Sequence, residues 1–471
     1  MTSTGIFIFR RDLRLDDNHG LAELAKVVDT IVPVFFLDTY QIVKAEHNKH
    51  YFSNNAVQFM CESLVDLDAQ LRAHGGGSAL QLYYGDPKVS LKALIKKYKP
   101  THVAWNADYS AYAIARDTAM EEVCKAAAAT PVVCHSDFTL RPMEDNLSGA
   151  GGGFKQFGAF YKRASRQKPM EPVPFSGAAF IKGSKSPFSP KSLKRFYTPN
   201  PQIAQHGGRT IALKKLHDVS LFREYTAKRD QLDYNTTNLS AALNFGCVSI
   251  REAYYGIRKA IQDSEALTRQ LYWRDFYLQA ARYLPYATDY KRLMDERYER
   301  IPWRNGKADW EQLIASKTGF LLIDAAMQEM QQTGFMHNRA RMLVVIFWTK
   351  YLLIHILHPQ YGSQVNYSRF LVDAVGPSQN KLNHHWAVDM DFPGKKFSAP
   401  GAPLSGRPMD VSNKMIKKWD PQGAYIHKWL PHLKDVPVKE LARWDGSSTL
   451  HPGPMFDPKK KYGEWIEACK I

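Results

Sequence analysis

The sequence has few cysteines and no long hydrophobic run. Its 471 residues include five cysteines, which are scattered and form no Cys-x-x-Cys pair, so neither a disulfide framework nor a thiolate zinc site is expected. The most apolar stretch, Leu343–Leu357, is interrupted by Lys350 and His355, and it is too short to cross a membrane. The first residues lack the basic and apolar regions of a signal peptide. These absences favour an intracellular protein that does not span a membrane.

Acidic residues are also in short supply, but only in one part of the chain. There are 63 Lys and Arg residues against 46 Asp and Glu, a net charge of +17. Residues 1–137 hold 14 basic and 16 acidic residues, a net charge of −2, so residues 138–471 carry +19. A strongly basic region indicates a polyanionic partner. Nucleic acid is the first candidate, an anionic membrane surface is the second, and charge kept only for solubility is the third interpretation.

The first third of the chain alternates between short apolar segments and amphipathic ones. Alternation of this kind predicts a parallel sheet with helices on both faces. The strands are predicted at Ile6–Phe9, Ile31–Leu37, Leu80–Tyr84, His102–Trp105 and Pro131–His135. The helices between them are predicted at Leu21–Val27, Ala56–Ala73, Val89–Tyr98 and Ala111–Ala127.

The rest of the chain changes character twice. Residues 138–220 are rich in Gly, Pro and Ser, which predicts a long linker with one helical piece at Phe154–Ser165. From residue 221 the 3.6-residue period dominates. We therefore expect a doubly wound, Rossmann-like α/β domain over residues 1–137, a linker over 138–220 and an all-α domain over 221–471. Its helices are predicted at Leu239–Phe245, Ile250–Ile261, Ala266–Tyr283, Trp310–Ala315, Ile323–Thr333 and Asn338–Leu357.

Two segments of the helical part carry side chains suited to a ligand. Thr236–Ser240 supplies hydroxyls and an amide just before a predicted helix. Free backbone N–H groups at such a position bind anions, although the same side chains also serve as simple helix caps. In the second segment, four residues recur at i, i+3, i+4 and i+7 and so share one helix face, which would make a wall for a planar ring system with phosphates. These residues are Gln270, Trp273, Arg274 and Tyr277.

A third segment places an arginine on an otherwise apolar helix. Asn338, Arg341 and Met342 are spaced to share one face. A guanidinium in such surroundings needs a carboxylate to offset the cost of its desolvation. Asp373 is the candidate partner.

A series of motifs in a fixed order resembles the DNA photolyase/cryptochrome family along nearly the whole chain. Each motif is modest alone, but their common order is specific. The fold that the resemblance implies is an antenna-type α/β domain, a long linker and a helical domain that encloses a U-shaped FAD. The motifs are Phe9–Asn18, Phe154–Phe160, Thr236–Ser240, Trp273–Tyr277, Lys317–Met327, Met336–Met342, Trp419–Ile426 and Trp429–Pro431.

The resemblance implies FAD as the cofactor, active in its reduced form. Arg274 would face the pyrophosphate, Arg341 and Asp373 would pair beside the flavin ring, and Asn380 would approach its N5 edge. The cofactor-binding residues carried over from the family are Tyr225, Thr236, Thr237, Asn238, Leu239, Ser240, Gln270, Arg274, Asn338, Arg341, Asp373 and Asn380.

The family also implies a second, antenna chromophore, a folate or a deazaflavin. Asn106, Asp108 and Tyr109 follow a predicted strand of the front domain, where a ligand crevice would lie. The acidic anchor expected for a folate is replaced around Ile114. The identity of the second chromophore is left open.

The partner implied by the resemblance is UV-damaged DNA, bound by a monomer without sequence specificity. Trp273 and Trp386 match two indoles that hold a flipped-out pyrimidine dimer, Met342 and Asn338 match its floor, and Gln270 matches a polar contact. A damaged pair costs least to flip, and basic side chains bind phosphates without reading sequence. The expected lesion-binding residues are Gln270, Trp273, Tyr277, Asn338, Arg339, Met342 and Trp386, and the expected catalytic ones are Asn380, Gln270, Asn338 and Met342.

The implied activity is that of a deoxyribodipyrimidine photo-lyase, in which light-excited reduced FAD donates an electron to a cyclobutane dimer and splits it into monomers. Met336–Met342 is typical of the cyclobutane enzymes, because (6-4) enzymes have paired histidines at its start. Gln270 stands where cyclobutane enzymes usually have Glu, so a (6-4) photolyase is an alternative. A cryptochrome blue-light receptor is another, disfavoured because only 40 residues follow Pro431.

The family's electron-transfer chain of three tryptophans is expected to be broken here. His384 falls at the position of the flavin-proximal indole, and no Trp occurs between Trp348 and Trp386. Trp303 matches the surface member, and Trp348 and Tyr361 are possible substitutes. We predict slow or rerouted photoreduction of the oxidised flavin. No metal site is predicted, because no histidine spacing matches a zinc motif.

Overall fold

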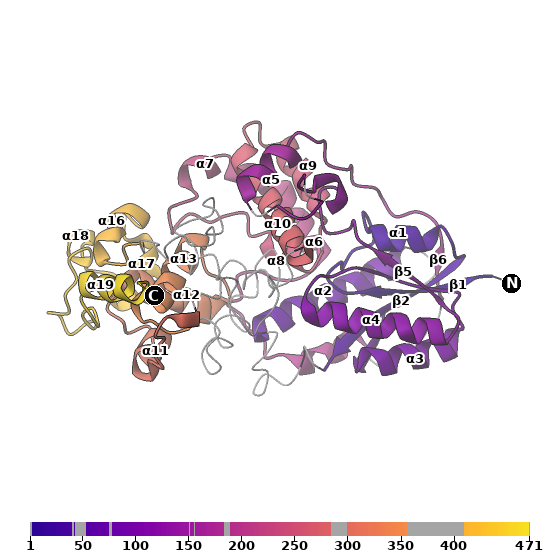
Figure 1. The fold of residues 1–471 in the computed structure, drawn as a ribbon, viewed down its shortest axis with the longest axis horizontal. Helices are drawn as coiled ribbons and strands as arrows, with labels where there is room; N and C mark the ends of the chain where they lie inside the picture. Colours follow the sequence, from indigo (N-terminus) through magenta and orange to yellow (C-terminus); the bar gives the residue numbers. More distant parts are fainter. Residues whose placement is uncertain are drawn as a thin grey trace.

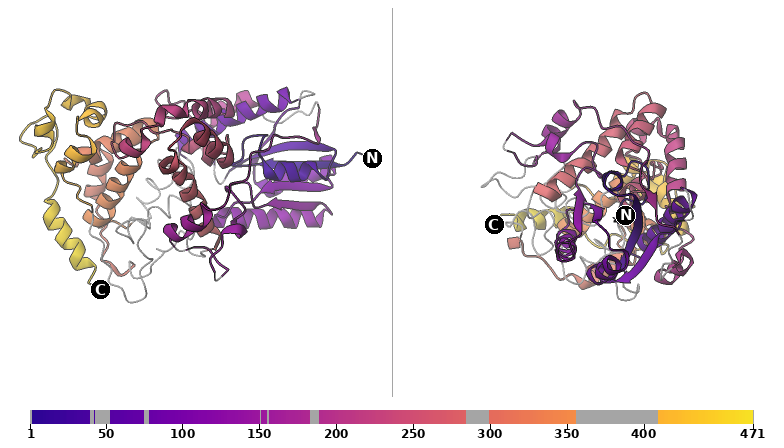
Figure 2. Two further views of the ribbon diagram at one scale, coloured as in Figure 1. Left: turned by 90° about the horizontal axis from the view of Figure 1, so that it is seen from above. Right: turned by 90° about the vertical axis from the view of Figure 1, so that its right-hand side faces the viewer.

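The computed structural model describes residues 2–39, 42, 53–74, 78–149, 151–154, 156–182, 189–283, 299–355 and 409–470. A sheet near the N-terminus lies at one end of an elongated molecule, and the helices of residues 409–470 lie at the other (Figure 1). Two views at right angles to the first show the same separation from other sides (Figure 2). The α/β-plus-helical architecture predicted from the sequence is confirmed.

The N-terminal part is a parallel sheet with strand order β3-β2-β1-β4-β5. The chain adds β2 and β3 on one side of β1 and β4 and β5 on the other, so the switch point lies between β1 and β4, and ligands bind at such points in open α/β sheets. The strands are β1 (Thr4–Phe9), β2 (Thr30–Asp38), β3 (Gln81–Gly85), β4 (His102–Asn106) and β5 (Thr130–Cys134). The helices are α1 (His19–Ala25), α2 (Asn54–Ala73), α3 (Pro87–Tyr98) and α4 (Ala111–Ala126).

Alternation along β1 sets the two faces of this sheet. Ile6 and Ile8 pack into a core shared with α3 and α4, whereas Phe7 and Phe9 pack into the core shared with α1 and α2. Each fully buried large apolar side chain contributes roughly 1.5–3 kcal/mol. The four helices begin at residues whose side chains accept a backbone hydrogen bond, as N-caps do. These caps are Asn18, Ser53, Asp86 and Ser110.

The linker takes part in both neighbouring structures. Its short strand β6 (Ala179–Phe180) pairs with β2, an addition that the sequence pattern does not predict. Its helix α5 (Phe157–Ala164) confirms the predicted helical piece and packs on α10 (Glu265–Tyr283). The core on the α1 and α2 side of the sheet continues through the linker to α10, and a separate core lies within residues 232–469. The domain boundaries at residues 137 and 220 stay a prediction.

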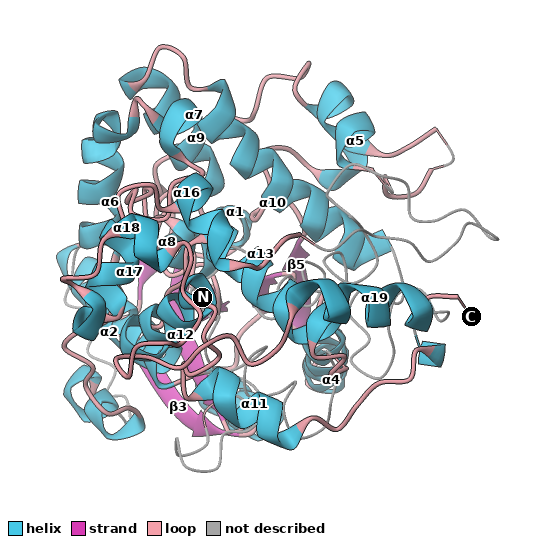
Figure 3. Cartoon of the chain, turned by 90° about the vertical axis from the view of Figure 1, so that its left-hand side faces the viewer, coloured by secondary structure: helices cyan, strands magenta, loops and turns pink. Residues whose placement is uncertain are grey.

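The helices predicted for the helical part are present, although their bounds differ, and Figure 3 shows them in cyan. The described residues contain no helix long and apolar enough to span a membrane. Helix α6 (Arg209–His217) lies in the linker, and the helices of the helical part before residue 300 are α7 (Tyr225–Lys228), α8 (Ser240–Asn244), α9 (Ile250–Ala260) and α10. Those after it are α11 (Lys307–Ile314), α12 (Leu321–Thr333), α13 (Asn338–Ile346), α16 (Ile416–Trp419), α17 (Ala424–Trp429), α18 (Val438–Leu441) and α19 (Pro458–Ala468).

The prediction of one helix over residues 338–357 is wrong at its C-terminal end. Helix α13 ends at Ile346, and a single π-helical turn follows it over Phe347–Tyr351. Leu353 then adopts a left-handed φ of 53°, which ends the helix. The wider turn carries only buried side chains, including Trp348, so packing overrides the regular period here.

Buried charges fasten the loop of residues 10–19, which follows β1, to the linker and to α9. Nε of Arg251 donates to Oδ2 of Asp17 at 2.8 Å, and its Nη1 donates to the carbonyls of Asp137 and Thr139 at 2.9 and 2.8 Å. Burial alone would raise the pKa of Asp17, but the hydrogen bond from His19 and the charge of Arg251 outweigh it and lower that pKa. Loss of either partner would leave an uncompensated buried charge.

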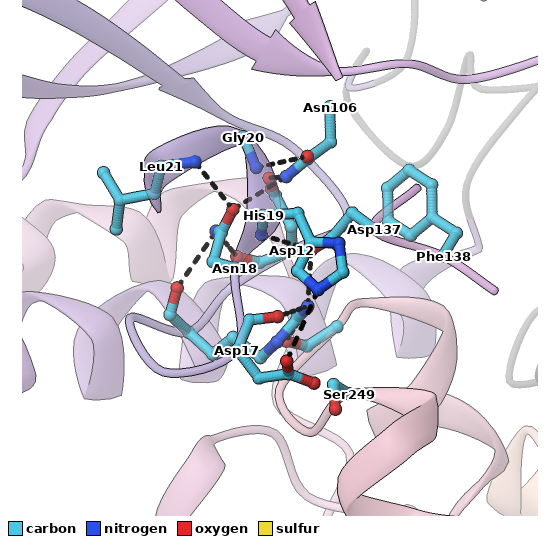
Figure 4. Close-up of polar contacts among 12 residues, drawn as sticks. Asp12, Asp17, Asn18, His19, Gly20, Leu21, Asn106, Asp137, Phe138 and Ser249 are labelled. Atoms are coloured by element: carbon cyan, nitrogen blue, oxygen red, sulfur yellow. Dashed lines mark hydrogen bonds and ion pairs between the residues drawn. The ribbon is translucent and has the colours of Figure 1, made fainter. Parts of the chain in front are cut away.

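A second group in the same loop holds the end of β4 (Figure 4). Asp12 accepts hydrogen bonds from the backbone N–H of Arg10 and from Nδ2 of Asn106. Nδ2 of Asn106 also donates to Oδ1 of Asn18 at 2.8 Å, and its Oδ1 accepts from the N–H of Gly20 at 2.9 Å. Burial raises the pKa of Asp12 to about 6. This network fixes the loop beside the switch point of the sheet.

Candidate functional site

The segment Thr236–Ser240 leads into α8, as the sequence predicts. Leu239 is buried, and Thr236 and Thr237 are half-buried. Asn238 has a left-handed φ of 50°, and its Oδ1 is buried with no hydrogen-bond partner among the described residues. A buried acceptor of this kind beside accessible hydroxyls is suited to a ligand that brings donors of its own.

Two linker residues that the sequence pattern did not single out complete this segment. Nζ of Lys215 donates to the carbonyl of Asn238 at 3.4 Å, and burial lowers the pKa of Lys215. Oε1 of Gln205 accepts from the N–H of Ala241 at 3.2 Å, and its Nε2 lies 3.5 Å from Oγ of Ser240. A cation and an amide beside hydroxyl groups favour an anionic ligand. Gln205 and Lys215 lie too far from Thr236–Ser240 in the sequence to belong to the same local motif.

Arg274 of α10 lies buried at the other end of α8. It is 4% exposed, its Nη1 donates to the carbonyl of Phe138, and its Nη2 lies 3.5 Å from the carbonyl of Leu243. Burial lowers the pKa of Arg274 to about 9, although neighbouring Asp275 opposes the shift. Arg274 therefore joins α10 to α8 and to the linker. Its expected contact with a pyrophosphate stays a prediction.

The aromatic pair predicted on α10 is present. The rings of Trp273 and Tyr277 lie 5.6 Å apart at 30°. Gln270 is exposed, and its Nε2 donates to the carbonyl of Ala266 at 3.1 Å. The indole also meets a partner that the sequence did not suggest: Phe157 of α5 stacks on Trp273 with ring centroids 3.5 Å apart and planes 7° from parallel.

Helix α13 carries the third predicted group. Asn338 is exposed at its first turn, and Arg341 and Met342 are half-buried one turn later. Nε of Arg339 donates to Oδ1 of Asp230 at 2.8 Å. Arg339, a predicted DNA contact, is therefore also an internal link between α13 and the segment after α7.

The start of α13 is fixed by a buried polar group. His337 is the N-cap, and its Nδ1 accepts from the N–H of Arg339 at 3.1 Å. Oε2 of Glu329 on α12 accepts from the N–H of His337 at 3.3 Å and from the hydroxyl of Tyr425 at 2.6 Å. Burial lowers the pKa of His337 to about 4 and raises that of Glu329.

The remaining predicted residues are partly accounted for. Tyr225 is half-buried in α7, and burial raises its pKa. Trp348 is fully buried, 5.2 Å from Trp310, whereas Trp303 is half-exposed and lies 6.4 Å from Trp465. Four residues with predicted roles lie outside the described residues, as does His384. They are Tyr361, Asp373, Asn380 and Trp386.

A pocket opens at the carboxyl ends of β1 and β2, beside the residues that follow β4. It contains about 700 Å³ of empty space, part of which is open to solvent. Four lining residues each carry a buried polar atom with no hydrogen-bond partner among the described residues. These atoms are Nη2 of Arg10, Nε of Arg11, Nη2 of Arg116 and Oδ1 of Asn244.

The pocket combines charge with apolar walls. Burial alone would raise the pKa of Asp108, but the charges of Arg11 and Arg116 outweigh it and lower that pKa. Orphaned guanidinium donors beside aromatic walls suit a planar ligand with acceptor or anionic groups. The walls include Phe35, Phe36, Met60, Met120 and Phe245.

Of the three residues expected at this crevice, the structure brings one into the lining. Asp108 lines the pocket, whereas Asn106 holds the loop after β1. The hydroxyl of Tyr109 lies 3.3 Å from Nδ1 of His135. Asn244 and Phe245, at the end of α8, also line the pocket, so the sheet and helical parts both contribute to it.

Comparison with known proteins gives matches to both parts. Residues 6–177 match the family model described as DNA photolyase, and residues 267–470 match the FAD binding domain of DNA photolyase. The deoxyribodipyrimidine photo-lyase of a Synechococcus species is 28% identical over 94% of this chain and 90% of its own. That of Halobacterium salinarum is 28% identical over 97% of this chain and 96% of its own.

Among solved structures, an archaeal photolyase from Sulfolobus tokodaii superimposes with a TM-score of 0.83. The two sequences are 29% identical, and the match covers 99% of each chain. That crystal structure is described as holding two FAD molecules, with the implication of a novel light-harvesting cofactor.

Proposed function

The chain belongs to the DNA photolyase/cryptochrome family, and on that premise we propose that it is a light-dependent DNA repair enzyme, a deoxyribodipyrimidine photo-lyase. One observation carries the proposal. The residues that match the FAD binding domain include both α10, with its aromatic wall, and α13. A flavin cradle and a base-stacking surface on the same helices are what light-driven repair of a flipped base requires.

The side chains around Asn238 fit FAD. Its orphaned Oδ1 can accept from a ribityl hydroxyl, and Lys215 supplies a cation for the pyrophosphate. The hydroxyls of Thr236, Thr237 and Ser240 would complete the cradle. When bound, reduced and excited by light, the flavin supplies the electron that opens the lesion's cyclobutane ring. The protein's own part is to bind and orient both molecules and to exclude water.

The aromatic wall of α10 fits a base extruded from DNA. Trp273 and Tyr277 offer ring surface, and Met342 and Asn338 would form a floor. We keep the cyclobutane dimer as the substrate on the strength of Met336–Met342, with the (6-4) lesion as the alternative. The charge of +19 on residues 138–471 would bind DNA phosphates without sequence preference. We propose that the protein acts as a monomer inside the cell, where the DNA is.

The polar side chains that line the pocket of the sheet part suit a second chromophore. The orphaned atoms of Arg10, Arg11, Arg116 and Asn244 would be satisfied by a ligand that carries acceptors and at least one donor. We propose a flavin or deazaflavin there rather than a folate, since Ile114 stands near the expected acidic anchor. A chromophore in this pocket would add to the light that the protein collects.

A repair assay tests the function. The flavin-loaded, reduced protein is incubated with duplexes that hold one cyclobutane dimer, one (6-4) product or no lesion, in blue light and in the dark. We expect restoration of the cyclobutane duplex in light only, measured by chromatography of the digested DNA. Repair of the (6-4) product alone would show that this product, and not the cyclobutane dimer, is the substrate. Flavin-loaded protein that repairs neither would favour a receptor, and purified protein without flavin would overturn the proposal.

A further inference from the structure

Trp273 belongs to a stack of aromatic rings that crosses from α10 to the linker helix α5. Phe157 lies against the indole with centroids 3.5 Å apart and planes 7° from parallel. Tyr161 stacks behind Phe157 at 5.6 Å and 22°. The guanidinium of Arg269 lies 4.7 Å from the Tyr161 ring and 5.4 Å from the Phe157 ring. Each such contact stabilises the orientation of the next ring.

The neighbours on α10 itself do not align the indole in this way. Phe276 meets Trp273 edge-on, at 6.0 Å and 86°, and Tyr277 meets it at 5.6 Å and 30°. The near-parallel contact comes from another element of the chain. Phe157 therefore sets the plane of the indole and covers one of its two faces.

Phe157 is itself held firmly. Its side chain is 3% exposed and meets Phe276 edge-on at 5.8 Å. The segment before α5 is tied to α10, because the N–H of Phe154 donates to Oε1 of Gln279 at 2.8 Å. The far end of the stack is tied as well, since the hydroxyl of Tyr161 donates to Glu265 at 3.1 Å. A ring packed in this way is a fixed support.

We propose that Phe157 is a positioning residue for lesion recognition. It holds the indole of Trp273 in one plane before DNA arrives, so that the indole is already oriented when the extruded dimer binds. A dimer has puckered, saturated carbons and gains little from stacking, so its binding depends on a wall that is already in place. A side chain that is fixed beforehand need not be ordered on binding. The inference rests on the proposed function and gives a role in lesion recognition to a residue that lies outside α10.

The test is dark binding of flavin-loaded protein to a duplex with one cyclobutane dimer and to the same duplex undamaged. Phe157→Leu keeps an apolar side chain and removes the ring. We expect it to weaken binding to the damaged duplex about tenfold, the size of one aromatic contact, and to leave undamaged DNA binding unchanged. Phe157→Tyr should restore the affinity, because the ring is kept.

A matched control separates positioning from loss of packing. Phe160 lies in the same helix, is 2% exposed, and packs on Phe276 at 5.6 Å. Phe160→Leu should lower the melting temperature as Phe157→Leu does but preserve the ratio of damaged to undamaged affinity. In a Trp273→Ala background, Phe157→Leu should cost no further lesion affinity, since there is no indole left to hold.

Each outcome decides the matter. Equal loss of discrimination in Phe157→Leu and Phe160→Leu, or additive losses in the Trp273→Ala background, would overturn the inference alone. Wild-type protein that fails to distinguish damaged from undamaged DNA would overturn the proposed function together with it.

Discussion

Nε2 of His451 lies 2.9 Å from Oδ2 of Asp324, which fastens the C-terminal loop to the first turn of α12. The carboxylate is fully buried and also accepts from the N–H groups of Thr318 and Gly319, at 3.0 and 2.9 Å. Nε2 of His432 lies 3.0 Å from Nδ1 of His451. His432 is exposed, so two imidazoles connect the surface to a buried carboxylate. The pKa of His432 is lowered, first by partial burial of its ring and second by the neighbouring His451.

Replacement of the carboxylate should destabilise the helical part strongly. Asp324→Asn turns one acceptor oxygen into a donor that faces the N–H groups or His451, so we expect a loss of about 2–4 kcal/mol in the free energy of unfolding. Urea unfolding followed by tryptophan fluorescence measures it. His432→Ala, which removes only the exposed end of the chain, should cost less than about 1 kcal/mol. Equal losses in the two variants would contradict the role given to Asp324.

Asp275 should make stability depend on pH from about pH 4, its unfolded pKa, to just above its folded pKa of about 7. Its Oδ2 accepts from the N–H of Leu140 at 2.9 Å, and its Oδ1 has no hydrogen-bond partner in the described part of the chain. Burial raises the pKa of Asp275 from 3.8 to about 7. Because the folded pKa lies above the unfolded one, the stabilisation is complete below about pH 4 and is lost as the pH rises through 7.

The expected consequence is a loss of about 1 kcal/mol in wild-type stability from pH 6 to pH 8 through this group. Asp275→Asn does not titrate and should lose correspondingly less over the same interval. Asp233→Asn, at an exposed position, serves as the control and should follow the wild type. Denaturant midpoints at several pH values measure the difference. Parallel curves for Asp275→Asn and wild type would refute the assignment.

Much of the fold follows from local pattern. Alternation in β1 separates Ile6 and Ile8 from Phe7 and Phe9, and the strands and early helices lie where the periodicity predicts them. The i, i+4 spacing also brings Trp273 and Tyr277 together. These features depend on residues a few positions apart, for which backbone geometry alone decides which residues share a face of the helix or strand.

The rest depends on partners distant in sequence. Arg251 reaches Asp17 across 234 positions, and Phe157 reaches Trp273 from the linker. Neither contact produces a periodic pattern in the sequence. The Arg10–Arg11 pair is visible in the sequence, but its place in a pocket becomes clear only when the chain brings Asn244 beside it. Tertiary packing also explains the π-helical turn that ends α13 early.

Arg116 should bind the second chromophore without affecting FAD. Its Nη2 is buried with no hydrogen-bond partner among the described residues, and it lines the pocket of the sheet part. Arg116→Leu should weaken chromophore binding about ten- to hundredfold, since a hydrogen bond to a charged group contributes roughly 1.5–3 kcal/mol. Titration of FAD-loaded protein with FMN, followed by fluorescence, measures this.

The matched control is an arginine outside the pocket. Arg72 of α2 is exposed and pairs with Asp68 at 2.7 Å, and Arg72→Leu should leave FMN binding as it is. The absorbance of FAD should be the same in both variants. If Arg116→Leu bound FMN as tightly as the wild type does, the pocket would not be the FMN site.

Trp348 is the described residue best suited to replace a missing member of the electron-transfer chain. It is fully buried, and its ring lies 5.2 Å from that of Trp310, so one indole, once oxidised, can take an electron from the other. Trp303, by contrast, pairs with Trp465 at 6.4 Å. We expect slow photoreduction of oxidised FAD in blue light with excess thiol, and a further several-fold slowing in the double variant Trp348→Phe, Tyr361→Phe. Flavin absorbance measures the rate, and repair by dithionite-reduced protein checks that the variant is folded. Rapid photoreduction that survives both substitutions would show that the electron takes another route.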